Sequence, residues 1–394
     1  MQSDKIRVGI VGLGLVSSAH LKGYESHPRA EIVAVCDTDA ERVREFAKIH
    51  GIAGTYTSYE EMLRHAAIDA VDIATPTHLH AQMTRMAAEA GKHVHCEKPF
   101  SRTVAEGLEA TEAAAKAGVK LAVGETYVFV TPHVKARELI DQGEIGRPMQ
   151  IRHRHGAWVA REQPAIPVGP LDRGWRIDPE QSGGGAYPWI FDHAVHFFAA
   201  AEYFASDARI AEVYSLASRV DEAGQSGVSA PHDPYAKPEQ DIPIVTWTYE
   251  NSAMQGAWMR AEPLNGKFDF MRGFSATIIG ETGAIEVLGE GGHGLVWNGI
   301  QQHLVLHRSG KETVAYRFDE SPDDIWQSDI SYYSQGHINQ VHHFVDSIVN
   351  DTQPRYDGAA GTHAVRCTLA TIRSAQESRP IKVSDIEPSY AAYG

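Results

Sequence analysis

Two short segments carry residues whose types and spacing could perform acid–base chemistry. In VHCEKPF, Lys98 follows an apolar run and stands between a glutamate and a proline, where it could donate a hydrogen bond to a substrate oxygen. In the segment 175–202, Asp192 and His196 are four residues apart, so on a helix they share one face and could form a general base with a charge-stabilising neighbour. A surface lysine before a proline turn and a helix with satisfied core histidines are the alternatives.

A metal centre is a further alternative for the second segment. Asp192, His193 and His196 have a spacing that could ligate a metal, but the sequence offers no obvious cluster of third ligands beside them. We therefore expect no metal at this position.

The opening of the chain predicts a nucleotide-binding turn. The apolar run IRVGIVG ends in Gly12-x-Gly14-x-x-Ser17, and such a turn between a strand and a helix holds a dinucleotide pyrophosphate at the helix N-terminus. Asp37 ends the next apolar run, where a carboxylate should bind the adenosine ribose hydroxyls and repel a 2′-phosphate. A structural turn in another α/β protein is the alternative. The pattern predicts NAD rather than NADP, contacted by Gly12, Gly14, Leu15, Val16 and Asp37.

Two later strand ends add candidates for the cofactor site. Thr75-Pro76-x-x-x-His80 follows the run AVDIAT, and Pro76 would stiffen the turn there, although simple helix initiation explains it equally well. Glu97 and Lys98 follow the run KHVHC, and the Lys98–Pro99 bond is a candidate for the cis form found at some tight turns.

Histidines, tryptophans and arginines after residue 126 are candidates for substrate binding. His153 and His155 alternate with Arg152 and Arg154 on a presumed strand, so the histidines share one face, whether structural or lining a cleft. The arginines between 152 and 176 could bind an anionic substrate or could instead pair with nearby acidic residues. Buried packing is as plausible as sugar stacking for the tryptophans. The full set of substrate candidates is Tyr127, His155, Trp158, Trp175, Arg176 and His193.

The elements that must position these residues fall into two groups. Up to about residue 125, apolar runs alternate with helical stretches, two of which open with the capping boxes Ser58/Glu61 and Thr103/Glu106. This alternation predicts a Rossmann-type, doubly wound parallel sheet, whose ligands bind at the carboxyl ends of the strands. Thr131-Pro132 predicts a helix start. Beyond Arg147-Pro148, alternating runs predict a C-terminal α+β domain with a large, mostly antiparallel, open-faced sheet.

We place the Rossmann domain at 1–128 and the substrate-binding and oligomerisation domain at 129–358. Helices are predicted at 186–205, 335–350 and 359–377, and a C-terminal helix at about 359–390 is expected to pack back on the Rossmann domain. Residues 220–241, rich in Asp, Pro, Gly and Ser, are predicted to form a loop.

Composition limits the class of protein. The 394 residues carry 36 basic and 51 acidic side chains, a formal charge of −15, which argues against nucleic acid or anionic membrane as a partner. Three scattered cysteines fit a reducing compartment, and the N-terminus has no signal-peptide pattern, so we expect a cytoplasmic protein without membrane spans. The apolar face of the second sheet predicts a homodimer or homotetramer.

Taken together, the motifs resemble the Gfo/Idh/MocA oxidoreductase family, which includes glucose–fructose oxidoreductase and inositol dehydrogenase. The resemblance rests on VGIVGLGLVSSAHL, ATPTHLHAQM, CEKPF, WRIDPEQSGGG, FDHAVHFF and HHFVDSIVNDTQPR, and it spans essentially the whole chain. It implies that Lys98 contacts the reacting hydroxyl and that Asp192 and His196 supply the acid/base pair. The usual spacing after the three glycines would instead select Trp189 and His193, so we infer an insertion of about three residues at Tyr187 to Trp189.

The resemblance implies an NAD-dependent dehydrogenase that oxidises a secondary ring hydroxyl of a sugar, glycoside or cyclic polyol. In this mechanism His196 removes the hydroxyl proton, Asp192 orients and stabilises the histidine, and Lys98 polarises the oxygen. An alternative is an NAD-dependent glycoside hydrolase that oxidises, eliminates, hydrates and reduces again. A non-catalytic NAD-binding sensor is a third possibility, against which the complete set of three catalytic candidates argues.

Overall fold

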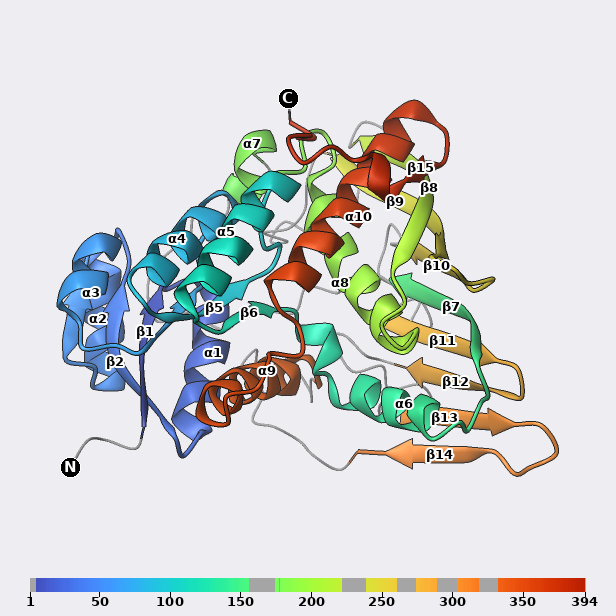
Figure 1. Ribbon diagram of the computed structural model, residues 1–394, viewed down its shortest axis with the longest axis horizontal. Helices are drawn as coiled ribbons and strands as arrows, with labels where there is room; N and C mark the ends of the chain where they lie inside the picture. The colour runs from blue at the N-terminus through green and yellow to red at the C-terminus, as the bar shows by residue number, and fades with distance from the viewer. Residues whose placement is uncertain are drawn as a thin grey trace.

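The computed structural model describes residues 5–155, 174–176, 178–221, 239–260, 274–288, 303–318 and 332–393. Two β-sheets lie side by side, with helices over the first sheet and on one side of the second (Figure 1). The predicted combination of a parallel sheet and a larger, mostly antiparallel sheet is confirmed.

The first sheet has six parallel strands in the order β3-β2-β1-β4-β5-β6. Its strands are β1 (Ile6–Val11), β2 (Ala30–Cys36), β3 (Gly54–Tyr56), β4 (Ala70–Ile73), β5 (His93–Glu97) and β6 (Leu121–Gly124). The connecting helices are α1 (Leu15–Ser26), α2 (Ala40–His50), α3 (Tyr59–His65), α4 (Thr77–Glu89) and α5 (Val104–Ala117). The strand order reverses at β1, so the ligand crevice expected of such sheets lies at the carboxyl ends of β1 and β4.

Local sequence explains where these helices begin. The hydroxyls of Ser58 and Thr103 accept hydrogen bonds from the backbone N–H groups of Glu61 and Glu106, which are the N-terminal caps that the sequence predicted. Asp39 caps α2 in the same way. Strand β3 was not predicted, because three residues are too few to show a periodic pattern.

The second sheet has nine strands in the order β14-β13-β12-β11-β7-β10-β9-β8-β15. Only β10 and β7 pair in parallel; the other neighbours are antiparallel. The strands are β7 (Pro148–His155), β8 (Ile210–Asp221), β9 (Glu239–Tyr249), β10 (Gln255–Arg260), β11 (Phe274–Gly280), β12 (Gly283–Leu288), β13 (His303–Arg308), β14 (Val314–Arg317) and β15 (Ile381–Lys382). The predicted loop 220–241 is wrong at its ends, which extend β8 and β9, and its middle lies outside the described residues.

One face of this sheet is covered and the other is open. Along β9, Val245, Trp247 and Tyr249 are buried, whereas the residues that alternate with them, Ile244, Thr246 and Thr248, are exposed. The buried face packs against α8 (Pro188–Phe204), and α6 (Thr131–Asp141) lies over β12 and β13. The helix start predicted at Thr131-Pro132 is therefore confirmed. The short elements η1 (Thr126–Val128), η2 (Gly174–Arg176), α7 (Pro179–Ser182) and η5 (Val383–Asp385) complete the described fold.

The last two long helices depart in part from expectation. α9 (Tyr332–Val349) falls in the segment that we assigned to the second domain, yet it packs against α1 (Figure 1). It does so because Val341, Phe344 and Val345 complete the apolar core around β1. α10 (Gly358–Glu377) packs between the two sheets. It contacts β6 of the first sheet with the neighbouring helix α5, and β8 of the second sheet with the helix α8. It ends at Glu377 and not near 390, since the chain then turns into β15.

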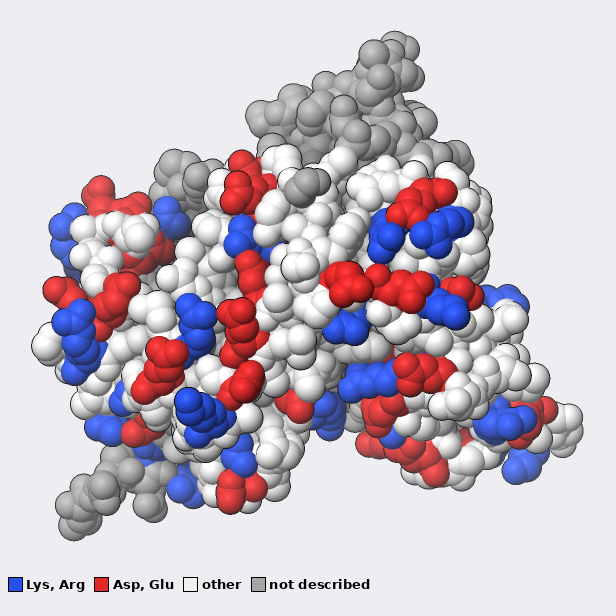
Figure 2. Space-filling view, turned by 45° about the horizontal axis from the view of Figure 1, so that its top comes forward, with Lys and Arg blue, Asp and Glu red and all other residues white. Residues whose placement is uncertain are grey.

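Acidic and basic side chains alternate over the face drawn in Figure 2 and do not form a single basic patch there, as expected for a chain with a formal charge of −15. Within the described ranges, no helix is both long enough and apolar enough to cross a membrane.

Candidate active site

The turn between β1 and α1 has the shape that a dinucleotide phosphate requires. Gly12 has φ +85°, and a Cβ there would lie 2.5 Å from the carbonyl oxygen of Ala74, so only glycine fits. A Cβ at Gly14 would meet nothing within 4 Å, which leaves open space before α1. The first turn of α1, with Leu15 and Val16, has neither a capping side chain nor an acidic residue. Its N–H groups are therefore available to a phosphate, and the residues fit the predicted cofactor.

Asp37 stands at the carboxyl end of β2, next to this turn. Its Oδ2 accepts a hydrogen bond from the backbone N–H of Leu13 at 2.8 Å, and its Oδ1 accepts one from Asp39 at 3.0 Å. Asp37 thus holds the glycine-rich turn in place, and each oxygen keeps a lone pair for a ribose hydroxyl. Ribose binding by Asp37 stays a prediction.

His80 ties together the two loops that follow β4 and β5. Its Nδ1 lies 2.7 Å from the carbonyl oxygen of Pro99, and its Nε2 lies 2.7 Å from that of Thr75. The ring is 1% exposed, and burial lowers the pKa of His80. A neutral ring carries one N–H, so it donates to one carbonyl at a time. His80 therefore fixes the loops and has almost no surface to offer a cofactor, while Pro76 caps the start of α4. The Lys98–Pro99 peptide bond is cis.

Lys98 reaches from the first sheet to the second domain. Its Nζ lies 3.2 Å from Oδ1 of Asp192 and 3.1 Å from the carbonyl oxygen of the same residue. Arg176 contacts the other carboxylate oxygen of Asp192 at 3.2 Å. Burial opposes ionisation of Asp192, but Lys98 and Arg176 hold its pKa well below the usual value. The side chains of Lys98 and Asp192 are 11% and 13% exposed, so this ion pair is accessible only at its edge.

The start of α8 explains how Asp192 comes to face Lys98. A Cβ at Gly184 would lie 2.7 Å from Cα of Pro188, so the glycine allows the turn to fold closely onto the helix. Pro188 is the first residue of α8, a position that proline favours. Asp192 follows one turn later, and it is Asp192, not Trp189, that contacts Lys98.

His196 is oriented by a residue that the sequence analysis did not identify. Its Nδ1 lies 2.6 Å from Oε1 of Glu125, and both residues are buried. Since a carboxylate can only accept, Nδ1 carries the proton. Our expectation that Asp192 orients His196 was wrong, because the carboxylate of Asp192 is engaged by Lys98 and Arg176. The position of Glu125 directly after β6 is the signal that could have identified it.

His193 occupies the neighbouring position and differs in its partners. Its Nδ1 donates to the carbonyl oxygen of Trp189 at 3.1 Å and lies 3.8 Å from Oδ2 of Asp192. Burial, assisted by Arg260 and Lys98 and opposed by Asp192, holds the pKa of His193 well below its usual value. His193 is therefore neutral, and no carboxylate of the described residues lies at hydrogen-bonding distance from it.

The remaining substrate candidates are divided. Tyr127 and His155 are almost fully buried; the Tyr127 ring lies 4.7 Å from that of His196, and the His155 ring lies 5.0 Å from that of His193. They support the two histidines, and direct substrate contact by either remains a prediction. Trp175 lies under the guanidinium of Arg176 at 5.1 Å. Trp158 lies outside the described residues.

Of the arginines predicted to bind an anionic substrate or to pair with acidic residues, Arg161 and Arg173 lie outside the described residues, so an anionic substrate stays a prediction. Arg176 is engaged by Asp192, whereas Arg152 is exposed and bonds Gln150. His153 and His155 are both buried, and Arg152 and Arg154 lie on the opposite face of β7, as the alternation predicted.

Metal ligation by Asp192, His193 and His196 has no support in the described residues. Three groups there have ligand atoms close enough to hold an ion, and none includes these residues. The groups are His20/Asp72/His95, His20/Glu97/His337 and Glu202/His363/Cys367.

Comparison with known proteins identifies the family of the chain. The family profile described as an oxidoreductase family with an NAD-binding Rossmann fold matches residues 6–125, and that of its C-terminal alpha/beta domain matches residues 137–383. Myo-inositol 2-dehydrogenase of Thermotoga maritima is 24% identical over 97% of this chain and 99% of its own length. Levoglucosan dehydrogenase of Pseudarthrobacter phenanthrenivorans is 30% identical over 49% of this chain and 50% of its own. For several relatives the match thus spans only about half of their length.

Solved structures show the same fold. A levoglucosan dehydrogenase in complex with NADH and levoglucosan superposes with a TM-score of 0.73 at 22% identity, covering 96% of this chain and 99% of that one. An oxidoreductase of Agrobacterium radiobacter in complex with NAD+ gives 0.77 at 18% identity, over 97% and 100%. From the matched profiles over both domains, the chain belongs to the Gfo/Idh/MocA oxidoreductase family and is an NAD-binding oxidoreductase.

Proposed function

We propose that the protein is an NAD-dependent dehydrogenase that takes a hydride from a secondary ring hydroxyl of a sugar, glycoside or cyclic polyol. The contact between Lys98 and Asp192 carries this proposal, because it joins the end of β5, beside the cofactor turn, to the helix that bears the two histidines. The names of relatives that act on myo-inositol and levoglucosan support the substrate class.

Lys98 is the hydrogen-bond donor to the substrate oxygen in this proposal. Asp192 holds the ammonium by two contacts, one to its side chain and one to its backbone carbonyl. An ammonium has three N–H bonds, so one remains for the substrate. The carboxylate also binds Arg176, which brings a second cation to the same edge of the site.

His196 is the general base. Glu125 keeps the proton on Nδ1, which leaves Nε2 as the atom that accepts the hydroxyl proton. The imidazolium formed by that step is stabilised by the carboxylate at 2.6 Å. Among the described residues, the carboxylate nearest to His193 is that of Asp192 at 3.8 Å, and the cations Lys98 and Arg260 lie nearby, so His193 is the poorer base. Bound NAD+ supplies the hydride acceptor.

Substitution of the two proposed groups tests these roles. We expect K98A and H196A to lower turnover by at least about 100-fold with the fold intact, because general acid–base groups contribute that much or more. H193A serves as the comparison and should retain more activity than H196A. Near-normal turnover in K98A or H196A, with circular dichroism unchanged, would refute the role of that residue.

A substrate screen separates the dehydrogenase from the hydrolase. Polyols, neutral sugars and acidic sugars are incubated with NAD+, and formation of NADH is followed by absorbance. Stoichiometric NADH supports the dehydrogenase. Release of nitrophenol from nitrophenyl glycosides without net NADH identifies a hydrolase with catalytic NAD, and NAD+ binding without either product identifies a sensor. Rates that are far higher on acidic sugars would show an anionic substrate.

A further inference from the structure

The interior of the parallel sheet contains a charged residue among apolar neighbours. Asp72 lies in β4 and is fully buried, and its register partner in β5 is the equally buried His95. Strands covered on both faces normally read as continuous apolar runs. A carboxylate in such a position is costly unless its oxygens are fully engaged by donors.

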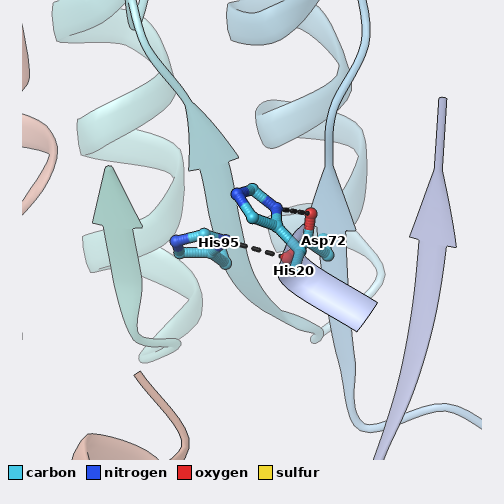
Figure 3. A group of neighbouring side chains, drawn as sticks. All are labelled: His20, Asp72 and His95. Atoms are coloured by element: carbon cyan, nitrogen blue, oxygen red, sulfur yellow. Dashed lines mark hydrogen bonds and ion pairs between the residues drawn. The ribbon is translucent and has the colours of Figure 1, made fainter. Parts of the chain in front are cut away.

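Three donors converge on Asp72. The His20 ring from α1 places Nδ1 2.9 Å from Oδ1, and the His95 ring places Nδ1 2.8 Å from Oδ2. Both rings point at the carboxylate in Figure 3. The hydroxyl of Tyr24 donates to Oδ2 at 2.7 Å. The carboxylate of Asp72 is thus held from α1 and from β5 at once.

The second nitrogen of His20 continues the chain toward the active site. Nε2 lies 3.1 Å from Oε1 of Glu97, and Oε2 of Glu97 accepts a hydrogen bond from the backbone N–H of Lys98 at 3.2 Å. An uninterrupted series of polar contacts therefore runs from the middle of β4 through α1 to the residue that binds Asp192.

Metal binding explains this cluster poorly, although His20, Asp72 and His95 lie close enough together to be considered as ligands. Their nitrogen–oxygen distances of 2.8 and 2.9 Å are hydrogen-bond lengths. Tetrahedral ligands bound at about 2.1 Å would stand about 3.4 Å apart. The carboxylate also accepts from Tyr24, so the cluster is satisfied without an ion.

We propose that Asp72 and His20 are positioning residues of the active site: they hold Glu97 as a fixed carboxylate beneath the backbone of Lys98, and so fix the turn that presents the Lys98 side chain to Asp192. This inference rests on the function proposed for Lys98.

The charges of the cluster agree with this role. Burial opposes protonation of His20, but Asp72 and Glu97 raise its pKa to about 10. Burial likewise opposes ionisation of Glu97, but His20 lowers its pKa to about 2. Burial also opposes ionisation of Asp72, but His20 and His95 hold the pKa of Asp72 well below its usual value. At neutral pH the cluster is therefore carboxylate–imidazolium–carboxylate.

The other groups around His20 and Glu97 are compatible with that arrangement. Burial lowers the pKa of His337 to about 3, so it is neutral, and Nε2 of His95 is buried without a hydrogen-bond partner in the described part of the chain. The amide nitrogen of Gln340 lies 3.2 Å from Nε2 of His20 and 3.3 Å from Nδ1 of His337. A protonated His20 requires the opposite amide orientation, in which the oxygen of Gln340 faces Nε2. The titratable groups that face the cluster are Tyr24 from α1, Cys96 and Lys98 beside Glu97, and His337 from α9.

Histidine ¹⁵N NMR of the full chain without substrate tests the charge of His20 and needs no substitution in the cluster. At pH 8.5 ordinary histidines are neutral. His363 is a second histidine with a raised pKa. Burial opposes its protonation, but Cys367 and Glu202 raise the pKa of His363 to about 10. We expect H363Q to retain one imidazolium with both ring nitrogens protonated. A spectrum of H363Q in which every ring is neutral would overturn the proposal.

Asp72→Asn tests the link to Lys98. Without the Asp72 charge, the pKa of His20 should fall toward its usual value. His20 then loses its proton as pH rises above about 7, and Glu97 no longer has a cation beside it. We expect the alkaline limb of kcat/KM for D72N to move to lower pH by about one unit or more. We also expect kcat to fall on the order of 10-fold at pH 8, because small displacements at the reacting centre are costly.

Glu202→Gln is the matched control. Glu202 is also a buried carboxylate, bonded to Arg209 at 2.8 Å and His363 at 2.9 Å, between α8 and α10. The E202Q substitution should lower the melting temperature and leave the shape of the pH profile of kcat/KM unchanged. A folded D72N with an unchanged profile, or the same shift in E202Q, would contradict the proposal. If wild type shows no turnover on any substrate, the proposed function fails, whereas the NMR result still judges the charge of His20.

Discussion

Replacing Glu125 by glutamine isolates the contribution of one oxygen to the chemistry of His196. Oε1 of Glu125 accepts from Nδ1 of His196 at 2.6 Å and from the backbone N–H of Tyr127 at 3.1 Å. Oε2 is buried and has no hydrogen-bond partner within the ranges that the structure describes. Glutamine has the same shape but must place an NH2 group at one of these two positions.

Both orientations of the glutamine are unfavourable. With its oxygen toward His196, the amide NH2 is buried without an acceptor at the former position of Oε2, at a cost of about 1–3 kcal/mol. With the NH2 toward His196, Nδ1 must accept, so the proton moves to Nε2, the atom that should take the substrate proton. In either case the negative charge that stabilises the imidazolium is lost. We expect kcat to fall about 100-fold, which corresponds to about 2.7 kcal/mol.

The assay is steady-state formation of NADH by wild type and E125Q, with NAD+ affinity measured separately by fluorescence titration. The KM for the substrate and the affinity for NAD+ should change by less than about threefold, because Glu125 contacts neither in the proposed arrangement. A melting curve controls for folding. A folded E125Q with kcat within about threefold of wild type would show that Glu125 does not activate His196.

Two further predictions concern the cofactor and the assembly. Asp37→Ala should weaken NAD+ binding about 10-fold or more and reduce the preference of the protein for NAD+ over NADP+. The reason is that the Asp37 carboxylate is the expected acceptor for the ribose hydroxyls and also holds the backbone of Leu13. Equal NAD+ affinities of wild type and variant in fluorescence titrations would contradict this prediction. A row of exposed apolar side chains crosses three strands on the open face of the second sheet. I244K, at the centre of this row, should convert a dimer or tetramer to monomers, as measured by sedimentation. An unchanged sedimentation coefficient, or a monomeric wild type, would contradict the expected interface. The row is Leu216, Ile244 and Met259, which are 53%, 47% and 43% exposed and are register neighbours.

The first sheet could be predicted from the sequence because its signals are local. Each buried strand is an apolar run, and the caps at Ser58 and Thr103 lie directly before their helices. The helix at 359–377 was equally clear, but its extension to 390 was not, since nothing in the periodic pattern shows that the chain turns at Ser378, which has φ 51°.

The candidate site was less accessible because its hydrogen bonds connect residues far apart in the sequence. Glu125 and His196 are 71 residues apart, and only the folded chain shows that they meet. Asp72 and His95 were visible as polar residues within two apolar runs, and that local conflict was a signal that the sequence analysis did not use. Residues defined by a motif, such as Gly12 and Lys98, could be found without the fold.

The packing of α9 and α10 has a consequence for how the chain acquires its structure. The apolar side chains of α9 close the core over β1, and Asp357, just before α10, forms a bridge with Ala122 in β6. The cofactor half, although encoded first, is therefore completed by helices that are synthesised after most of the second sheet. During translation its apolar surface stays uncovered until residue 377 has emerged, so a nascent chain that stalls earlier should be a target for chaperones.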